Sequence, residues 1–137
     1  MGRFAVDVKV SNNTDVQGAA IGALSPEKIR TTLLRGVVDS GAAKLVLPAS
    51  TVTQLGLNAI GEATVKYADQ RTATRPVVEE VRLELQGRHG TFSAIVEPDR
   101  TTALIGAIVL EDLDFLVDST KQCLVPRDPN RIVSEIE

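Results

Sequence analysis

The sequence is poor in the residues that metal sites and several kinds of active site require. Its 137 residues include one cysteine, Cys123, and one histidine, His89. A disulfide within the chain is therefore excluded, as is a metal site with several cysteine or histidine ligands from one chain. A catalytic triad would have to use His89, which lies in a predicted turn and is expected to face solvent. Cys123 has no evident partner base and is predicted to be a structural thiol.

Positive charge, aromatic side chains and long apolar runs are scarce as well. Eighteen acidic residues outnumber fifteen basic ones, and the four aromatic residues are Phe4, Tyr67, Phe92 and Phe115. Nucleic acid and anionic membranes are therefore poor candidates as partners, because both select basic surfaces. The sequence contains no run of 18 apolar residues, so no transmembrane helix is predicted. The N-terminus lacks a signal-peptide pattern. We expect a cytoplasmic protein.

The residues that are abundant favour β-structure in a single domain. Val, Ile and Thr together number 37, and apolar residues make up 43% of the chain. Residues 4–10 and 77–85 alternate between apolar and polar, which is typical of half-buried strands. Further strands are predicted at 31–38, 44–47, 63–67, 91–97, 103–106, 115–117 and 123–125. Many short strands with little helix predict an all-β barrel or sandwich.

The segments between these strands are predicted from their turn residues. Residues 11–15 and 87–90 are predicted to form turns, residues 17–28 an irregular segment, and the polar residues 68–76 a mobile hairpin tip or loop. Pro48 suits a helix start and Gly56 a helix end, so a short helix is predicted between them. Residues 107–114 could form one or two more helical turns.

One segment carries recognisable chemistry: Gly36-Val37-Val38-Asp39-Ser40-Gly41-Ala42. An aspartate directly after an apolar strand is delivered into the protein rather than to solvent. Burial of a lone carboxylate is costly, so the site needs compensating contacts. Ser40 offers a hydroxyl, and Gly41 leaves room for a close approach of backbone. A structural turn at the end of a strand is the alternative interpretation of Asp39.

Asp39-Ser40-Gly41-Ala42 resembles the signature of retroviral-type (retropepsin-like) aspartic proteases, as found in cellular or bacterial single-domain members. Other segments resemble that family in the same order along the chain. Residues 45–48 and 55–57 resemble the segment after the catalytic loop, and Leu104-Ile105-Gly106 resembles the element that braces this loop. The resemblance covers roughly residues 4–126. It divides the chain into a protease domain, residues 1–126, and a C-terminal tail, residues 127–137.

The resemblance implies a small closed β-barrel with one or two short helices that forms half of a twofold homodimer. Asp39 of each copy would then be catalytic and would activate a water between the two carboxylates. Ser40 and Gly41 would support the pair, and no metal or organic cofactor would be needed. An extended peptide or protein substrate would contact residues of the loop and of a flap hairpin: Gly41, Ala42, Ala43, Ala68, Asp69 and Gln70.

Two other hypotheses stay open. Ala43 and Lys44 stand where viral enzymes commonly have acidic residues, and Asp69-Gln70 replaces a common Asp-Gly flap tip. The chain could therefore be an inactive dimerisation or peptide-binding module with the same fold. It could also be a generic β-barrel with Asp39 in an ordinary turn. Asp118-Ser119 imitates the signature, but Thr120 stands where glycine is needed, so a hairpin turn is predicted there.

Overall fold

The computed structural model describes residues 3–130 and 134–137. Its first half contains β1 (Phe4–Asn12), α1 (Asn13–Ala20), a 3-10 turn (Pro26–Lys28), β2 (Thr31–Val38), β3 (Leu45–Pro48), α2 (Ala49–Leu55) and β4 (Ala59–Lys66). The second half contains β5 (Thr72–Leu85), β6 (Arg88–Glu97), β7 (Ala103–Ile105), α3 (Ala107–Asp112), β8 (Phe115–Asp118) and β9 (Cys123–Pro126).

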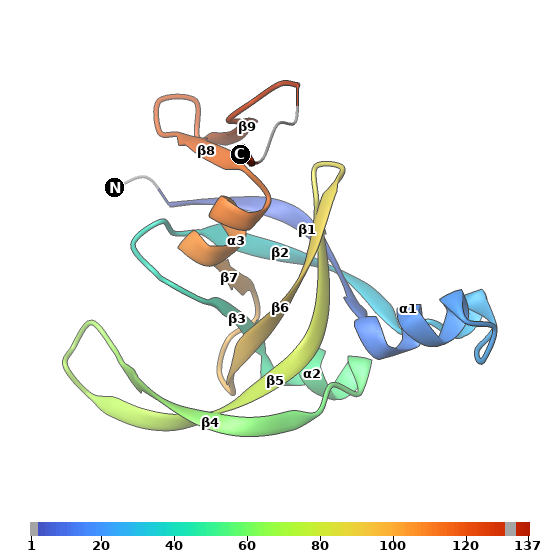
Figure 1. The fold of residues 1–137 in the computed structure, drawn as a ribbon. Helices are drawn as coiled ribbons and strands as arrows, with labels where there is room; N and C mark the ends of the chain where they lie inside the picture. Colours follow the sequence, from blue (N-terminus) through green and yellow to red (C-terminus); the bar gives the residue numbers. More distant parts are fainter. Residues whose placement is uncertain (1–2, 131–133) are drawn as a thin grey trace.

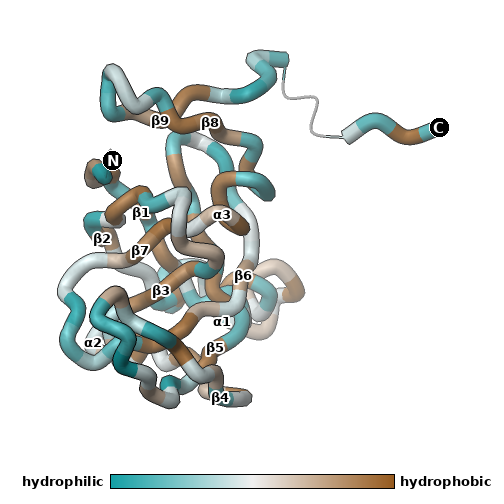
Figure 2. The backbone as a smooth tube through the Cα atoms, turned by 90° about the vertical axis from the view of Figure 1, so that its left-hand side faces the viewer, coloured by the Kyte–Doolittle hydropathy of each residue, from teal (hydrophilic) through white to brown (hydrophobic). Residues whose placement is uncertain are grey.

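Six of the strands close into a barrel. They are hydrogen-bonded in the order β1-β2-β7-β3-β6-β5, and a further pairing of β1 with β5 closes the ring. β2 pairs with β7 and β3 with β6 in parallel, whereas the other pairs are antiparallel. β4 pairs only with β5, and β8 and β9 form a separate sheet at the opposite end of the molecule (Figures 1 and 2). The predicted all-β barrel is confirmed.

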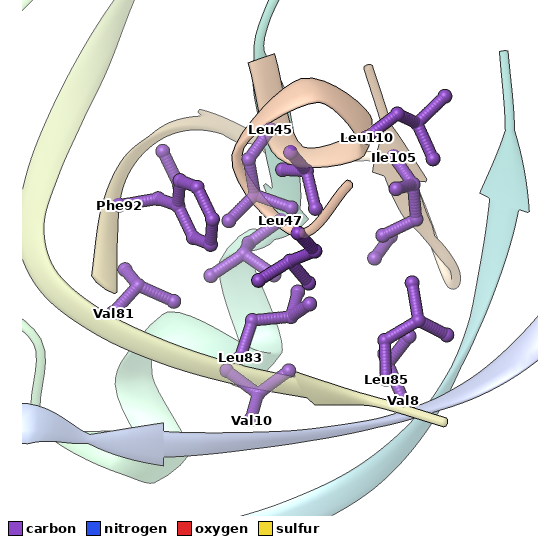
Figure 3. Close-up of a cluster of buried hydrophobic side chains, with 14 of the residues drawn as sticks. Val8, Val10, Leu45, Leu47, Val81, Leu83, Leu85, Phe92, Ile105 and Leu110 are labelled. Atoms are coloured by element: carbon purple, nitrogen blue, oxygen red, sulfur yellow. The ribbon is translucent and has the colours of Figure 1, made fainter. Parts of the chain in front are cut away.

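Alternation along the strands builds the core of this barrel. On β5, Val81, Leu83 and Leu85 are almost completely buried, while the residues between them are partly exposed. On β1, Val8 and Val10 point to the same interior (Figure 3). Each fully buried aliphatic side chain stabilises the fold by about 1.5–3 kcal/mol. The core also contains Leu45, Leu47, Phe92, Ile105 and Leu110.

The two hairpins around β5 differ from the prediction. The segment predicted as loop, residues 68–76, is mostly strand, because β4 and β5 pair as far as Lys66 and Thr72. Most of their side chains stay at least partly exposed in this two-stranded ribbon, so the apolar pattern of a strand is weak there. The other turn is Gln86-Gly87 alone, with positive φ at both residues, and β6 begins at once with Arg88. A two-residue turn with positive φ at both residues matches the right-handed twist of the two strands that it joins.

Helix α1 is a correction, since a loop and an irregular segment were predicted there. The Asn12 side chain accepts a hydrogen bond from the Asp15 amide at 3.1 Å and so caps the helix. Its amide group also donates to the Leu55 carbonyl at 2.8 Å. The asparagines that indicated a turn therefore begin a helix. With α1, the described residues hold three α-helices rather than one or two.

Helices α2 and α3 agree with the predicted segments. α2 ends at Gly56, which has the left-handed φ of 62° that was expected for a glycine at a helix end. α3 covers most of residues 107–114 and begins directly after Gly106. In the described part of the chain no helix has the length and apolar character needed to cross a membrane.

A partly buried ion pair connects α1 to the segment before β2. The Asp15 side chain is 10% exposed, and its carboxylate accepts hydrogen bonds from Arg30 at Nε (2.8 Å), at Nη2 (3.0 Å) and at the backbone amide (3.0 Å). These hydrogen bonds, with the charge of Arg30, lower the pKa of Asp15, although burial opposes the shift. A carboxyl with a lowered pKa stabilises the folded state when ionised and loses this effect in acid.

We therefore expect Asp15→Asn to lower the free energy of unfolding at neutral pH. The sign follows from the lowered pKa: the contribution is present above the pKa of the unfolded chain, about 3.9, and disappears as pH falls through the lower folded value. The difference between wild type and variant should shrink between about pH 5 and pH 2. Urea unfolding across this range measures it, and a difference that stays constant with pH would contradict the assignment.

Candidate active site

Asp39 follows β2 directly, in the loop that joins β2 to β3. Its backbone amide donates to the Ile105 carbonyl at 3.1 Å, which continues the pairing of β2 with β7 by one residue. The Asp39 side chain is 18% exposed. The strand thus places the carboxylate in a largely buried position near the barrel surface, where the sequence predicted that it is delivered into the protein rather than to solvent.

The loop folds back on Asp39 and orients its carboxylate. The Gly41 amide donates to Asp39 Oδ1 at 3.0 Å, and the Ala42 amide donates to the Asp39 carbonyl at 3.1 Å. A Cβ atom at Gly41 would lie 3.3 Å from Asp39 Oδ1, tighter than an ordinary contact. Ser40 is exposed on this loop. A carboxylate held by its own loop backbone needs no side-chain partner to keep its direction.

The segment Leu104-Ile105-Gly106 supports the loop through backbone pairing. Leu104 pairs with Val37 on one side and Val46 on the other, so β7 joins the two strands that flank the loop. Beyond it, the Ala107 amide donates to the Ala42 carbonyl at 2.7 Å, and the Ile108 amide donates to the Ala43 carbonyl at 3.0 Å. The residues from Asp39 to Ala43 are therefore fixed at both ends by backbone hydrogen bonds to β7 and α3.

Gly106 is the point of closest approach in this arrangement. A Cβ atom at Gly106 would lie 2.3 Å from the Lys44 carbonyl oxygen and 2.8 Å from that of Ala42. Both are backbone atoms, which cannot move aside without moving the loop. Glycine is required here for space, since φ is −91° and any residue could adopt it.

Arg3 is a neighbour of Asp39 that sequence reasoning missed. Its Nη2 atom lies 3.2 Å from Asp39 Oδ2, and its side chain is 72% exposed. The antiparallel register aligns Phe4 with Val38, which brings the residue before β1 beside the residue after β2. Only this register reveals the contact, because nothing in the sequence around Arg3 points to Asp39.

Ala68, Asp69 and Gln70 form the tip of the β4–β5 hairpin. The Gln70 amide donates to the Tyr67 carbonyl at 2.9 Å, and Gln70 takes a φ of 74°, a conformation that glycine adopts more easily. Asp69 accepts hydrogen bonds from the Arg71 side chain (2.7 Å) and amide (3.1 Å), which lower the pKa of Asp69. Figure 1 shows this tip on the same side of the barrel as the β2–β3 loop.

A cavity of about 420 Å³ separates the base of this hairpin from the barrel. Val46, Ile95 and Leu104 form its apolar floor. At one wall the Tyr67 hydroxyl donates to Glu97 at 2.6 Å and accepts from Arg75 Nε at 3.0 Å. The hydrogen bond to Tyr67, together with the nearby Glu97 carboxylate, raises the pKa of Arg75. The sequence placed Tyr67 near the hairpin base but gave no sign of this network.

The second Asp-Ser pair and the single histidine lie elsewhere. Asp118 ends β8, and its carboxylate accepts the Lys121 amide at 3.0 Å in the β8–β9 turn. His89 is exposed on β6. The structure therefore brings together Asp39, the loop after it and the β7 segment, and it places the base of the hairpin across a cavity from Leu104 of β7.

Gly106→Ala tests the support of the loop. The added methyl group would overlap backbone of residues 42 and 44, so we expect the free energy of unfolding to fall by about 1–3 kcal/mol or more. Gly61→Ala on β4 is the matched control, because a Cβ atom there meets nothing within 4 Å. Thermal and urea unfolding of both variants measure the effect. Equal stability of the two variants would show that the loop can move to accommodate the methyl group and would contradict this prediction.

The comparisons with known proteins agree with this architecture. A family model described as aspartyl protease matches residues 28–109, more than half of the chain. The EIAV protease, solved with the inhibitor HBY-793, superimposes with a TM-score of 0.55 at 18% identity, covering 81% of this chain and 88% of that one. The solution structure of the Simian Foamy Virus (mac) protease superimposes with a TM-score of 0.51 at 14% identity, covering 78% of this chain and 91% of that one.

A third structure is a foamy viral protease-reverse transcriptase in complex with an RNA/DNA hybrid. It has a TM-score of 0.49 at 23% identity over 58% of this chain, which spans only 10% of that larger protein. No curated protein sequence matches this chain. The likeness to the two proteases concerns the fold, and the family model adds the class of aspartic-type hydrolases. The chain belongs to the aspartyl protease family and has the retropepsin-like fold.

Proposed function

We propose that two copies of this chain form an aspartic endopeptidase that cleaves extended peptide or protein substrates. The single observation that carries the proposal is the β2–β3 loop: a half-buried Asp39 whose carboxylate is oriented by the Gly41 amide and whose backbone is held by β7. The described residues contain one such loop, and the Asp118 turn lacks the glycine needed to serve as a second one. A homodimer supplies the second carboxylate.

The chemistry follows from bringing two Asp39 carboxylates together on a twofold axis. Two carboxylates about 3 Å apart cannot both ionise, so they share one proton. The ionised member takes a proton from a water held between them, and the protonated member donates a hydrogen bond to the scissile carbonyl. The two groups titrate as one coupled pair. In this proposal Ser40 bonds across the dimer, and no metal is needed.

Arg3 has a specific place in this proposal. In the single chain its guanidinium contacts Oδ2 of Asp39, the oxygen that does not accept from Gly41. A second carboxylate at this position would compete with Arg3 for the same oxygen. Because the Arg3 side chain is largely exposed, it can turn away at little cost. Formation of the dimer would thus replace an ion pair with a shared proton.

The substrate would lie between the loop and the β4–β5 hairpin. An extended peptide pairs with exposed backbone by strand addition, and pockets for its side chains set specificity. The hairpin tip with Ala68, Asp69 and Gln70 and the loop residues Gly41 to Ala43 would supply these contacts. We assign residues 1–126 to the protease domain. Residues 127–137 would be a tail, whose first residue donates from its amide to the Asp114 carbonyl at 2.9 Å.

Asp39→Asn should abolish cleavage and leave the dimer intact. Asparagine is close in size to aspartate but can neither accept the proton from water nor share one, so the rate should fall by at least 10²–10⁴-fold, on the order of the general acid–base contribution. Mass spectrometry of a diverse peptide library, incubated from about pH 3.5 to 7.5, measures cleavage. Analytical ultracentrifugation measures the dimer.

Asp118→Asn is the control for this experiment. It removes a carboxylate from the other Asp-Ser pair, in a turn far along the chain from Asp39, and should leave cleavage unchanged. Cleavage that survives in Asp39→Asn would overturn the proposed mechanism. Absence of cleavage in the wild type at every pH, with dimer and peptide binding retained, would instead favour an inactive peptide-binding module.

A further inference from the structure

We propose that the cavity beneath the β4–β5 hairpin selects a glutamate side chain of the substrate, with Arg100 as the specificity-determining residue. This inference rests on the proposed function, because the cavity can act as a substrate pocket only if peptides lie between the hairpin and the Asp39 loop. It names the substrate class of that same site: peptides with an acidic residue close to the scissile bond.

The cavity lies near the candidate catalytic loop and is connected to it through β7, although none of residues 39–44 lines it. Leu104 forms part of its floor and pairs with Val37, two residues before Asp39. The next residue, Ile105, accepts the Asp39 amide. The opposite wall of the cavity is the hairpin base, at Lys66, Tyr67 and Arg71. A peptide that passes over Asp39 and under the hairpin can therefore place a side chain close to its scissile bond in this cavity.

The charges that line the cavity favour an anion. Four cationic residues lie around it, against two acidic residues, Glu97 and Asp99. Two of the four already have carboxylate partners: Arg75 pairs with Glu97 at 3.3 Å, and Arg71 pairs with Asp69 at 2.7 Å. Lys66 and Arg100 form no ion pair within the described residues. Asp99 also has no ion pair within the described residues, so a ligand with one negative charge would meet two such cations against one such carboxylate.

Arg100 is the better placed of these two cations. Its Nε donates to the Thr102 carbonyl at 2.9 Å, and its Nη2 lies 3.1 Å from the Thr102 hydroxyl, so the guanidinium is anchored by neutral oxygens. Its remaining nitrogen, Nη1, makes no hydrogen bond within the described residues. Arg100 is half-buried, whereas Lys66 is exposed. A fixed, partly desolvated guanidinium binds a carboxylate more strongly than a mobile surface ammonium does.

The floor explains why a long acidic side chain fits best. Val46, Ile95 and Leu104 offer an apolar surface below the charged rim. The methylene groups of glutamate can pack on this surface while its carboxylate reaches the rim. A basic side chain would meet like charges, and a purely apolar one would leave Arg100 without a partner. Because the dimer would contain two such cavities, the preference should occur on both sides of the scissile bond.

The first test compares matched peptides. Starting from a cleaved library sequence, each residue near the scissile bond is changed to Glu, Gln or Lys, and kcat/KM is measured for every peptide. We expect Glu to exceed Gln by about tenfold or more at one position on each side, the effect of a charge-assisted hydrogen bond. Lys should be worse than Gln. The Glu-to-Gln ratio should approach one below about pH 4, where the glutamate carboxyl protonates.

Three variants assign the preference to residues. Arg100→Gln should reduce the Glu-to-Gln ratio to nearly one, through a weaker kcat/KM for the Glu peptide. Lys66→Gln, on the exposed end of β4, should reduce it partially and without disturbing the fold. Arg82→Gln is the control: it removes the same charge from β5 outside the cavity, and it should leave the ratio unchanged. Circular dichroism melts verify that each variant is folded.

The outcomes separate this inference from the proposed function. Cleavage without a preference for Glu, or a preference that Arg100→Gln and Lys66→Gln leave intact, overturns the inference while the protease stands. If nothing is cleaved, the proposed function fails, and the test becomes binding to Asp39→Asn of fluorescently labelled library peptides that differ only by Glu or Gln at one position. Tighter binding of the Glu peptide that depends on Arg100 supports the acidic pocket, and equal binding of both peptides overturns it.

Discussion

The backbone contact between the Asp39 loop and the segment around Gly106 is the constraint on which the site depends. The loop is short and exposed, and alone it would be free to move. Hydrogen bonds from Ala107 and Ile108 to the carbonyls of residues 42 and 43 connect it to α3, whose core residues are buried. The absence of a side chain at Gly106 permits this approach. The orientation of Asp39 thus depends on elements that are packed into the core of the barrel.

Sequence patterns predicted the parts of this fold that obey a simple period. The alternation in residues 4–10 and 77–85 identified β1 and most of β5, and Gly56 identified the end of α2. The patterns failed where one residue type serves two structures. Asn12 and Asn13 indicated a turn but begin α1, and the polar residues 72–76 indicated a loop but continue β5. Side chains exposed on a ribbon carry no apolar signal.

The site shows the same division between local and long-range information. The motif at Asp39 and the glycine after Ile105 are local, and the sequence carried both. Strand register alone brings Arg3 to Asp39 and Arg75 to Glu97, and the fold places Arg100 around the same cavity as that second pair. Contacts of this kind join residues that are about 20 to 40 positions apart. No pattern in one sequence reveals them.

Electrostatics gives the two halves of the site opposite characters. The Asp39 pair would hold one negative charge at the dimer axis, while cationic side chains outnumber acidic ones around each neighbouring cavity. A peptide with acidic residues on both sides of its scissile bond is repelled at the centre and attracted at the flanks. The attraction acts in the bound complex at fixed positions, so it selects the register of the peptide as well as its composition. In the proposed dimer the twofold axis would relate the two cavities, whereas a peptide is not symmetric, so each bound peptide would present different side chains to two identical pockets.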